Sequence, residues 1–122
     1  MKVLVIISRD RDKASTQIRF VQYEAMLAAR DISLDYVRRD AIDAGVLQRI
    51  PYYDAVINQK CLMRKSLAAK VIASSRRLVF DMDDAIWTRP GRSHSWFTAW
   101  RVKARLRQWL QAADAVTAAN AY

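Results

Sequence analysis

Residues Lys2–Ser8 read KVLVIIS, in which five aliphatic residues follow one another without a polar break. A strand that is buried on both faces has this composition, whereas a strand with one solvent-facing side alternates apolar and polar residues. Strands buried on both faces are typical of parallel sheets that lie between two layers of helices. This stretch therefore predicts an α/β fold built on a parallel sheet.

Further strands follow at spacings that leave room for a helix between each pair. They are expected at Ile32–Arg38, Asp54–Gln59, Arg77–Met82 and Asp114–Ala118, and the first of these alternates as an edge strand does. Helices are expected from Ser15 or Thr16 to about Arg30, from Asp40 to about Arg49, from Cys61 to Ser74, and from Ser95 to about Ala112. Ser15 or Thr16, Asp40 and Ser95 are the expected N-terminal caps. The sequence thus predicts a Rossmann-like open parallel sheet of about five strands with helices on both faces.

The length of 122 residues and the composition limit the class of protein. One domain fits this length, and the hydrophobic fraction of 52% excludes a disordered chain. Because another helix should follow the fifth strand, we expect residues 1–122 to be an N-terminal domain truncated at its C-terminal end. A single cysteine, Cys61, excludes a disulfide framework and indicates a reducing compartment.

The charge is strongly basic and unevenly distributed, with a net value of +9. Ala55–Phe80 and Ala85–Ala113 each contain six basic residues and no acidic one, and Asp81, Asp83 and Asp84 lie between these blocks. A surface of this kind attracts nucleotides, phospholipid headgroups or nucleic acid. An ordinary solvated surface is the alternative.

The first loop after a strand, SRDRDKAS at residues 8–15, contains no glycine. Dinucleotide-binding turns and P-loops need glycines so that the backbone can approach phosphates, so the sequence excludes both classes. Arg9, Arg11 and Lys13 are candidates for holding an anion near the N-terminus of the following helix, and a solvated charged loop is the alternative. Arg19 lies one turn into the following helix, where it either points back toward the strand ends or lies on the helix surface as an ordinary solvated arginine.

Leu78–Trp87 reads LVFDMDDAIW, an apolar strand that ends in three carboxylates. A haloacid-dehalogenase-like phosphatase would use Asp81 as nucleophile and Asp83 as its partner. A metal-dependent sugar transferase would use the same pair to hold a divalent cation. A third possibility is that the carboxylates bind backbone N–H groups and sugar hydroxyls. The phosphatase lacks its second acidic pair, because only Asp114 follows, so we assign no catalytic residue and no metal site.

The last predicted helix carries two tryptophans and two cationic residues that could together contact a membrane surface or an anion. These residues are Trp96, Trp100, Lys103 and Arg107. The alternative is a helix that packs on the sheet with its aromatic residues and extends its cations at the flanks.

The chain resembles, over essentially its whole length, the N-terminal domain of group 1 glycosyltransferases with the GT-B fold. KVLVIIS is similar to the opening strand of that family, and ASTQIRF followed by ISLDYV is similar to its second segment. YDAVINQK, RLVFDMDDAIW and ADAVTAAN resemble the next three strands with their polar ends. The chain departs from the family in its charged first loop and in Asp83-Asp84, where many members have His-Asp.

The resemblance implies the acceptor-binding domain of an enzyme that transfers a sugar from a nucleotide sugar to an anionic or lipid-linked acceptor. A C-terminal domain, missing here, would bind the nucleotide sugar, so this chain alone is expected to be inactive. No metal or other cofactor is implied. The implied substrate-binding residues are Arg9, Ser15, Thr16, Arg19, Asp83, Asp84, Trp87, Arg92, His94 and Asn120.

The expected surroundings follow from the charge and the resemblance together. The protein should act in the cytoplasm at the inner face of the membrane, with an anionic membrane surface as a partner and nucleic acid not expected. An exposed sheet edge offers a surface for pairing with a second copy. A phosphatase built on Asp81 and Asp83, or a non-enzymatic basic anion-binding module, is the alternative function.

Overall fold

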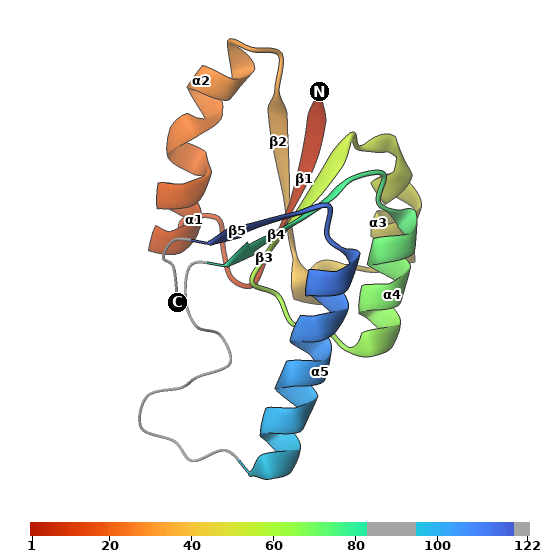
Figure 1. The fold of residues 1–122 in the computed structure, drawn as a ribbon. Coiled ribbons are helices and arrows are strands. Elements are labelled where there is room, and N and C mark those ends of the chain that lie inside the picture. The colour runs from red at the N-terminus through yellow and green to blue at the C-terminus, as the bar shows by residue number, and fades with distance from the viewer. Residues whose placement is uncertain (83–94, 119–122) are drawn as a thin grey trace.

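The computed structural model describes residues 1–82 and 95–118, and its centre is a parallel sheet of five strands in the order β2-β1-β3-β4-β5 (Figure 1). All four neighbouring pairs are parallel, which confirms the predicted open α/β sheet. The strands are β1 (Lys2–Ile7), β2 (Ser33–Arg38), β3 (Ala55–Gln59), β4 (Leu78–Met82) and β5 (Ala115–Ala118). The order is one that doubly wound α/β folds use, with ligands binding outside the carboxyl ends of the strands.

Helices cover both faces, as the sequence predicts (Figure 1). One face carries α1 (Ala14–Arg19), the short 3₁₀ turn η1 (Val21–Tyr23) and α2 (Glu24–Ala28). The other carries α3 (Ala44–Arg49), α4 (Lys65–Ser74) and α5 (Trp96–Ala112), with 3₁₀ turns η2 (Arg39–Ala41) and η3 (Ile50–Tyr52) beside α3.

The two faces of the sheet form two cores of different size, because successive strand residues point to opposite sides. Val3, Val5 and Ile7 are buried with Phe20 packed against them, on the face of α1. On the other face, Leu4 and Ile6 belong to a larger cluster that includes residues of β3, β4, η3, α4 and α5. The larger cluster therefore anchors three helices, whereas α1 to α2 rest on a small one.

Trp109 of α5 is the largest fully buried side chain of the larger core. Its ring stacks on Phe80 of β4 with the ring centroids 6.0 Å apart and the planes 12° from parallel. This contact shows that the C-terminal half of α5 packs on the sheet, as the core-helix alternative requires.

The prediction of a single helix up to Arg30 is wrong, because the helix is interrupted at Phe20. Phe20 leaves helical geometry at φ −132° and packs against the small core, and the chain resumes in η1 and α2. Neither Ser15 nor Thr16 caps α1. The N-cap residue is Lys13, whose side chain makes no capping hydrogen bond. Thr16 is instead turned into the structure and buried.

Two other helix starts also differ from the sequence prediction. Asp43, and not Asp40, caps α3 by accepting from the Val46 amide at 2.8 Å. The helix predicted from Cys61 begins only at Lys65, because Asn58 satisfies the Cys61 backbone in an irregular loop: its side chain accepts from Cys61 N at 2.9 Å and donates to Cys61 O at 3.0 Å. Ser95 does cap α5, accepting from the Thr98 amide at 3.3 Å.

Within residues 1–82 and 95–118, no helix is both long enough and apolar enough to cross a membrane.

Replacing Trp109 tests the larger core. Trp109→Ala removes a ring that is fully buried and should lower the free energy of unfolding by about 3–5 kcal/mol. Trp96→Ala is the matched control, because that side chain is 80% exposed and its loss should change stability by less than about 0.5 kcal/mol. Urea denaturation of both variants measures the difference, and similar values for the two would contradict the packing described.

Cys61 supplies a second test of the same core. Burial raises the pKa of the Cys61 thiol to about 12, so at pH 8 the folded protein holds on the order of a thousandfold less thiolate than an unfolded chain with an ordinary cysteine. Iodoacetamide should therefore alkylate the folded protein very slowly, and urea should restore the rate of a free thiol. Fast alkylation without denaturant would show that the loop at Asn58 does not hold Cys61 inside.

Candidate functional site

A polar cluster lies near the carboxyl ends of the central strands, on the α1 face of the sheet. We call it the Arg19 cluster, and it consists of Thr16 and Arg19 from α1, Gln59 from β3, Asp81 from β4 and Thr117 from β5. The strand register places Asp81 directly between Gln59 and Thr117, so the three side chains share one face. The cluster thus joins one helix to three neighbouring strands.

Asp81 is the centre of this cluster and is only 3% exposed. Its Oδ2 accepts from Arg19 Nε at 2.7 Å, and its Oδ1 accepts from Arg19 Nη2 and from Thr117 Oγ1. A buried carboxylate needs such compensation, because transfer of an unpaired charge out of water costs several kcal/mol. The forked contact fixes the plane of the guanidinium as well as its position.

Of the two expectations for Arg19, the structure therefore supports the one in which its side chain points toward the strand ends. Its side chain remains 23% exposed, so the guanidinium lies at the boundary between the cluster and solvent. The guanidinium is a planar group of N–H donors, and its Nε and Nη2 atoms bond Asp81. This geometry is suited to holding a phosphate or carboxylate beside the pair.

Thr16 and Gln59 form the buried side of the cluster. Thr16 Oγ1 donates to Gln59 Oε1 at 3.0 Å, and both side chains are buried. Gln59 Nε2 is also buried, and it has no hydrogen-bond partner among the described residues. A buried donor without a partner of this kind costs about 1–3 kcal/mol.

The backbone next to the cluster is held in an unusual conformation. Lys60 follows β3 with φ 48°, in the left-handed region that few residues other than glycine adopt. Its amide donates to the Asp81 carbonyl at 2.8 Å, which keeps the end of β3 against β4. The turn is thus fixed by the same strand that supplies the central carboxylate.

A groove of about 410 Å³ opens beside the cluster. Its polar end is formed by Arg19, Asp81 and Thr117. Its walls are apolar and consist of Ile18, Phe20, Tyr23, Ile57 and Val79. The volume lies within the range of small-molecule sites, and the lining suits a ligand with an anionic group attached to an apolar body.

The structure does not bring the first loop into this cluster. Arg11 donates to Glu24 at 2.5 Å, and this contact lowers the pKa of the Glu24 carboxyl. Arg38 of β2 donates to Asp10 at 2.9 Å, so the loop is tied toward β2. Arg9 is exposed on this loop, and no hydrogen bond links it to the Arg19 cluster.

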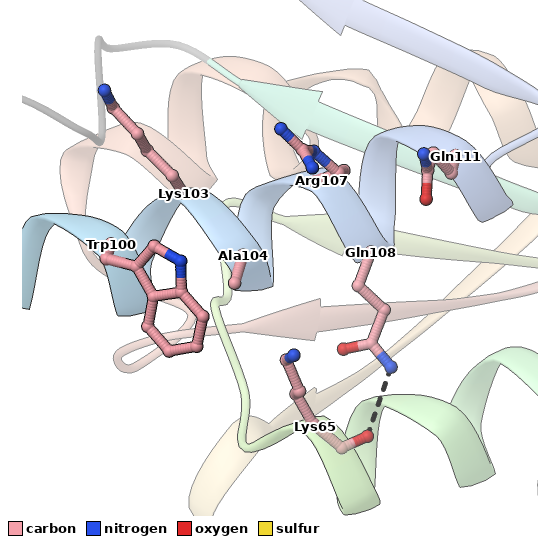
Figure 2. A pocket seen from close by; sticks show the side chains of 7 residues that line it. All are labelled: Lys65, Trp100, Lys103, Ala104, Arg107, Gln108 and Gln111. Atoms are coloured by element: carbon pink, nitrogen blue, oxygen red, sulfur yellow. Dashed lines mark hydrogen bonds between the residues drawn. The ribbon is translucent and has the colours of Figure 1, made fainter.

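The remaining predicted site residues fall into three groups. Ser15 is half-buried beside Thr16, and no hydrogen bond links it to the cluster within the described chain. The other six substrate-binding predictions lie outside the described residues and stay predictions: Asp83, Asp84, Trp87, Arg92, His94 and Asn120. Trp100, Lys103 and Arg107 do share one surface of α5, beside Lys65 of α4 (Figure 2).

Gln59 and Thr117 are the members of the cluster that the sequence did not identify. Each is a polar residue near the end of a short apolar strand, which is a usable signal because carboxyl ends of parallel strands meet at one edge. Their specific pairing depends on the register with β4, which local sequence does not contain.

No protein-family model matches the chain, and no curated protein or solved structure is significantly similar to it. In the part of the chain that the structure describes, no three His, Cys, Asp or Glu side chains lie close enough together to hold a metal ion.

The coupling between Arg19 and Asp81 can be measured with a double-mutant cycle. Arg19→Met leaves a buried carboxylate without its cation, and Asp81→Asn leaves the cation without its carboxylate, so each should destabilise the fold by about 2–4 kcal/mol. The double variant should be less destabilised than the sum, with a coupling energy of about 1–3 kcal/mol. Urea denaturation of the four proteins gives this value.

The exposed pair of Arg38 and Asp40, 2.7 Å apart, provides the control for that cycle. A solvent-exposed ion pair should give a coupling energy below about 1 kcal/mol. Equal coupling for the two pairs would mean that burial does not strengthen the Arg19 contact.

Proposed function

We propose that this chain is the acceptor-binding domain of a glycosyltransferase and that it holds an anionic, lipid-linked acceptor. The observation that carries the proposal is the groove on the α1 face of the sheet, with Arg19 at one end and apolar side chains along its walls. A polyprenyl phosphate has the matching chemistry, because a phosphate is joined directly to a branched hydrocarbon chain.

In this proposal each part of the groove has one role. Arg19 binds a phosphate oxygen of the acceptor, and Asp81 positions the guanidinium for this contact. Phe20, Ile57 and Val79 contact the first isoprene units and exclude water from them. The nucleotide sugar binds to another domain, as the resemblance to GT-B enzymes implies.

The environment of Asp81 favours this role over a phosphatase mechanism. A phosphatase nucleophile must present one carboxylate oxygen to a phosphorus atom. Both oxygens of Asp81 already accept hydrogen bonds, and the residue is almost completely buried. A carboxylate in this setting is well placed to orient Arg19 and poorly placed to attack a substrate.

Binding of a short soluble analogue tests the proposal. We expect geranyl phosphate to bind the folded chain, and geraniol and inorganic phosphate each to bind at least about tenfold more weakly, because each contacts only part of the groove. Chemical-shift changes in a ¹⁵N spectrum, mapped to β3, β4 and α1, measure the affinity and the place. Equal binding of geranyl phosphate and inorganic phosphate would contradict the role of the apolar walls.

Variants of the arginine provide the specific control. Arg19→Gln combined with Asp81→Asn keeps the pair neutral and should abolish geranyl phosphate binding while the protein stays folded by circular dichroism. Arg38→Gln combined with Asp40→Asn neutralises an exposed ion pair in the same way and should leave binding unchanged. The chain alone should show no sugar transfer, and no hydrolysis of p-nitrophenyl phosphate with Mg²⁺; hydrolysis that is lost in Asp81→Asn would favour the phosphatase instead.

A further inference from the structure

The N-terminal half of α5 exposes three aromatic rings, while its C-terminal half is anchored in the core. Trp96 is 80% exposed, Phe97 48% and Trp100 59%, whereas Trp109 is fully buried. In Figure 1 this half of the helix extends beyond the sheet, away from the strands. Large aromatic side chains that lie together in solvent mark an interaction surface, because single exposed residues are common but groups of them are not.

The Phe97 ring contacts both the Trp96 ring and the Trp100 ring, so the three form a continuous apolar ridge. The ring centroids of Trp96 and Phe97 are 6.1 Å apart in an edge-to-face contact, and those of Phe97 and Trp100 are 6.3 Å apart. We call Trp96, Phe97 and Trp100 the aromatic ridge. Since the rings are packed together before any partner arrives, little side-chain freedom remains to be lost on binding.

Cations from two helices border this ridge. Arg101 Cζ lies 5.0 Å from the Phe97 ring centroid, and Lys65 Nζ of α4 lies 5.9 Å from that of Trp100. Lys65, Lys103 and Arg107 line a groove of about 460 Å³ between α4 and α5, with Trp100 at one end (Figure 2). Gln108 fixes the two helices to each other by donating to the Lys65 carbonyl at 3.2 Å.

The charge of this surface has one sign. The sequence from Ala85 to Ala113 contains six basic residues and no acidic residue, so nothing within α5 neutralises Lys103 and Arg107. A partner that covers the surface must therefore be anionic where it meets the groove and apolar, or amphipathic, where it meets the ridge. The interfacial layer of an anionic bilayer has both properties within a few ångströms of depth.

We propose that α5 docks this protein on a membrane that contains anionic phospholipids. The aromatic ridge enters the headgroup region, where tryptophan is favoured because its ring is apolar and its N–H can bond to carbonyls and water. Lys65, Lys103 and Arg107 bind lipid phosphates along the groove. The proposal concerns a different face of the sheet from the Arg19 cluster and does not depend on the proposed acceptor.

Binding to lipid vesicles tests the proposal directly. Wild-type protein should co-sediment with vesicles of phosphatidylcholine and phosphatidylglycerol at a ratio of 3:1, and at least about tenfold more weakly with phosphatidylcholine alone, because the cations contribute only to anionic lipid. Binding should weaken as salt is raised. Equal binding to the two kinds of vesicle, or none to either, would overturn it.

Two sets of variants separate the ridge from the charge. Trp96→Ser with Trp100→Ser should weaken vesicle binding at least about tenfold, whereas Tyr52→Ser, which removes a 79% exposed aromatic ring on η3, should leave it unchanged.

Replacing Lys65, Lys103 and Arg107 by Gln should weaken binding about fivefold for each cation. The matched control replaces the exposed Arg30, Arg76 and Arg77 by Gln, which gives the same net charge. Equal losses in test and control variants would show that net charge alone drives binding.

A measurement on the unmodified protein avoids any effect of substitution on folding. Lipids brominated near the headgroup should quench tryptophan fluorescence of the wild-type protein on vesicle binding, because two of the four tryptophans lie on the ridge. Binding without quenching would exclude insertion of the ridge. Tighter binding to a twenty-residue oligothymidylate than to the anionic vesicles, at equal salt, would identify the surface as a nucleic-acid site and overturn the proposal.

Discussion

A single ion pair constrains where the first helix can lie. Asp81 is buried in β4, and its charge requires a cation at hydrogen-bonding distance. That cation, Arg19, comes from the connection between β1 and β2, which lie on the other side of β3 from Asp81. Arg19 must therefore reach across the sheet, which ties the end of α1 to β4, and the groove lies between that helix and the strands.

The strand pattern could be predicted from the sequence because burial of a parallel sheet leaves a local signature in runs such as Val3–Ile7. Helix starts and breaks were predicted less well, because they depend on distant contacts. Phe20 interrupts its helix to pack on the small core, and Asn58 uses its side chain to hold Cys61 out of a helix. Arg19 was a candidate from its position alone, whereas Thr117 became part of the site only through the register of β5.

The two proposed binding surfaces lie on opposite faces of the sheet but share one stretch of chain. The helix that carries the aromatic ridge leads through Asp114 into β5, and the Asp114 side chain accepts from the Leu78 amide at 2.7 Å at the start of β4. β5 then brings Thr117 to the central carboxylate. The position of α5 and the closure of the Arg19 cluster are thus set by the same connection.

The two edges of the sheet are chemically unequal. On β2, Asp35 and Arg38 are exposed and charged, as is common on edge strands that resist pairing with other chains. On β5, all four residues from Ala115 to Ala118 are exposed and none carries a charge. An additional strand would therefore pair more easily with β5 than with β2, because it would meet charged side chains at β2 and none at β5. Two copies joined edge to edge through β5 would form one continuous sheet about a two-fold axis, with both charged edges facing outward.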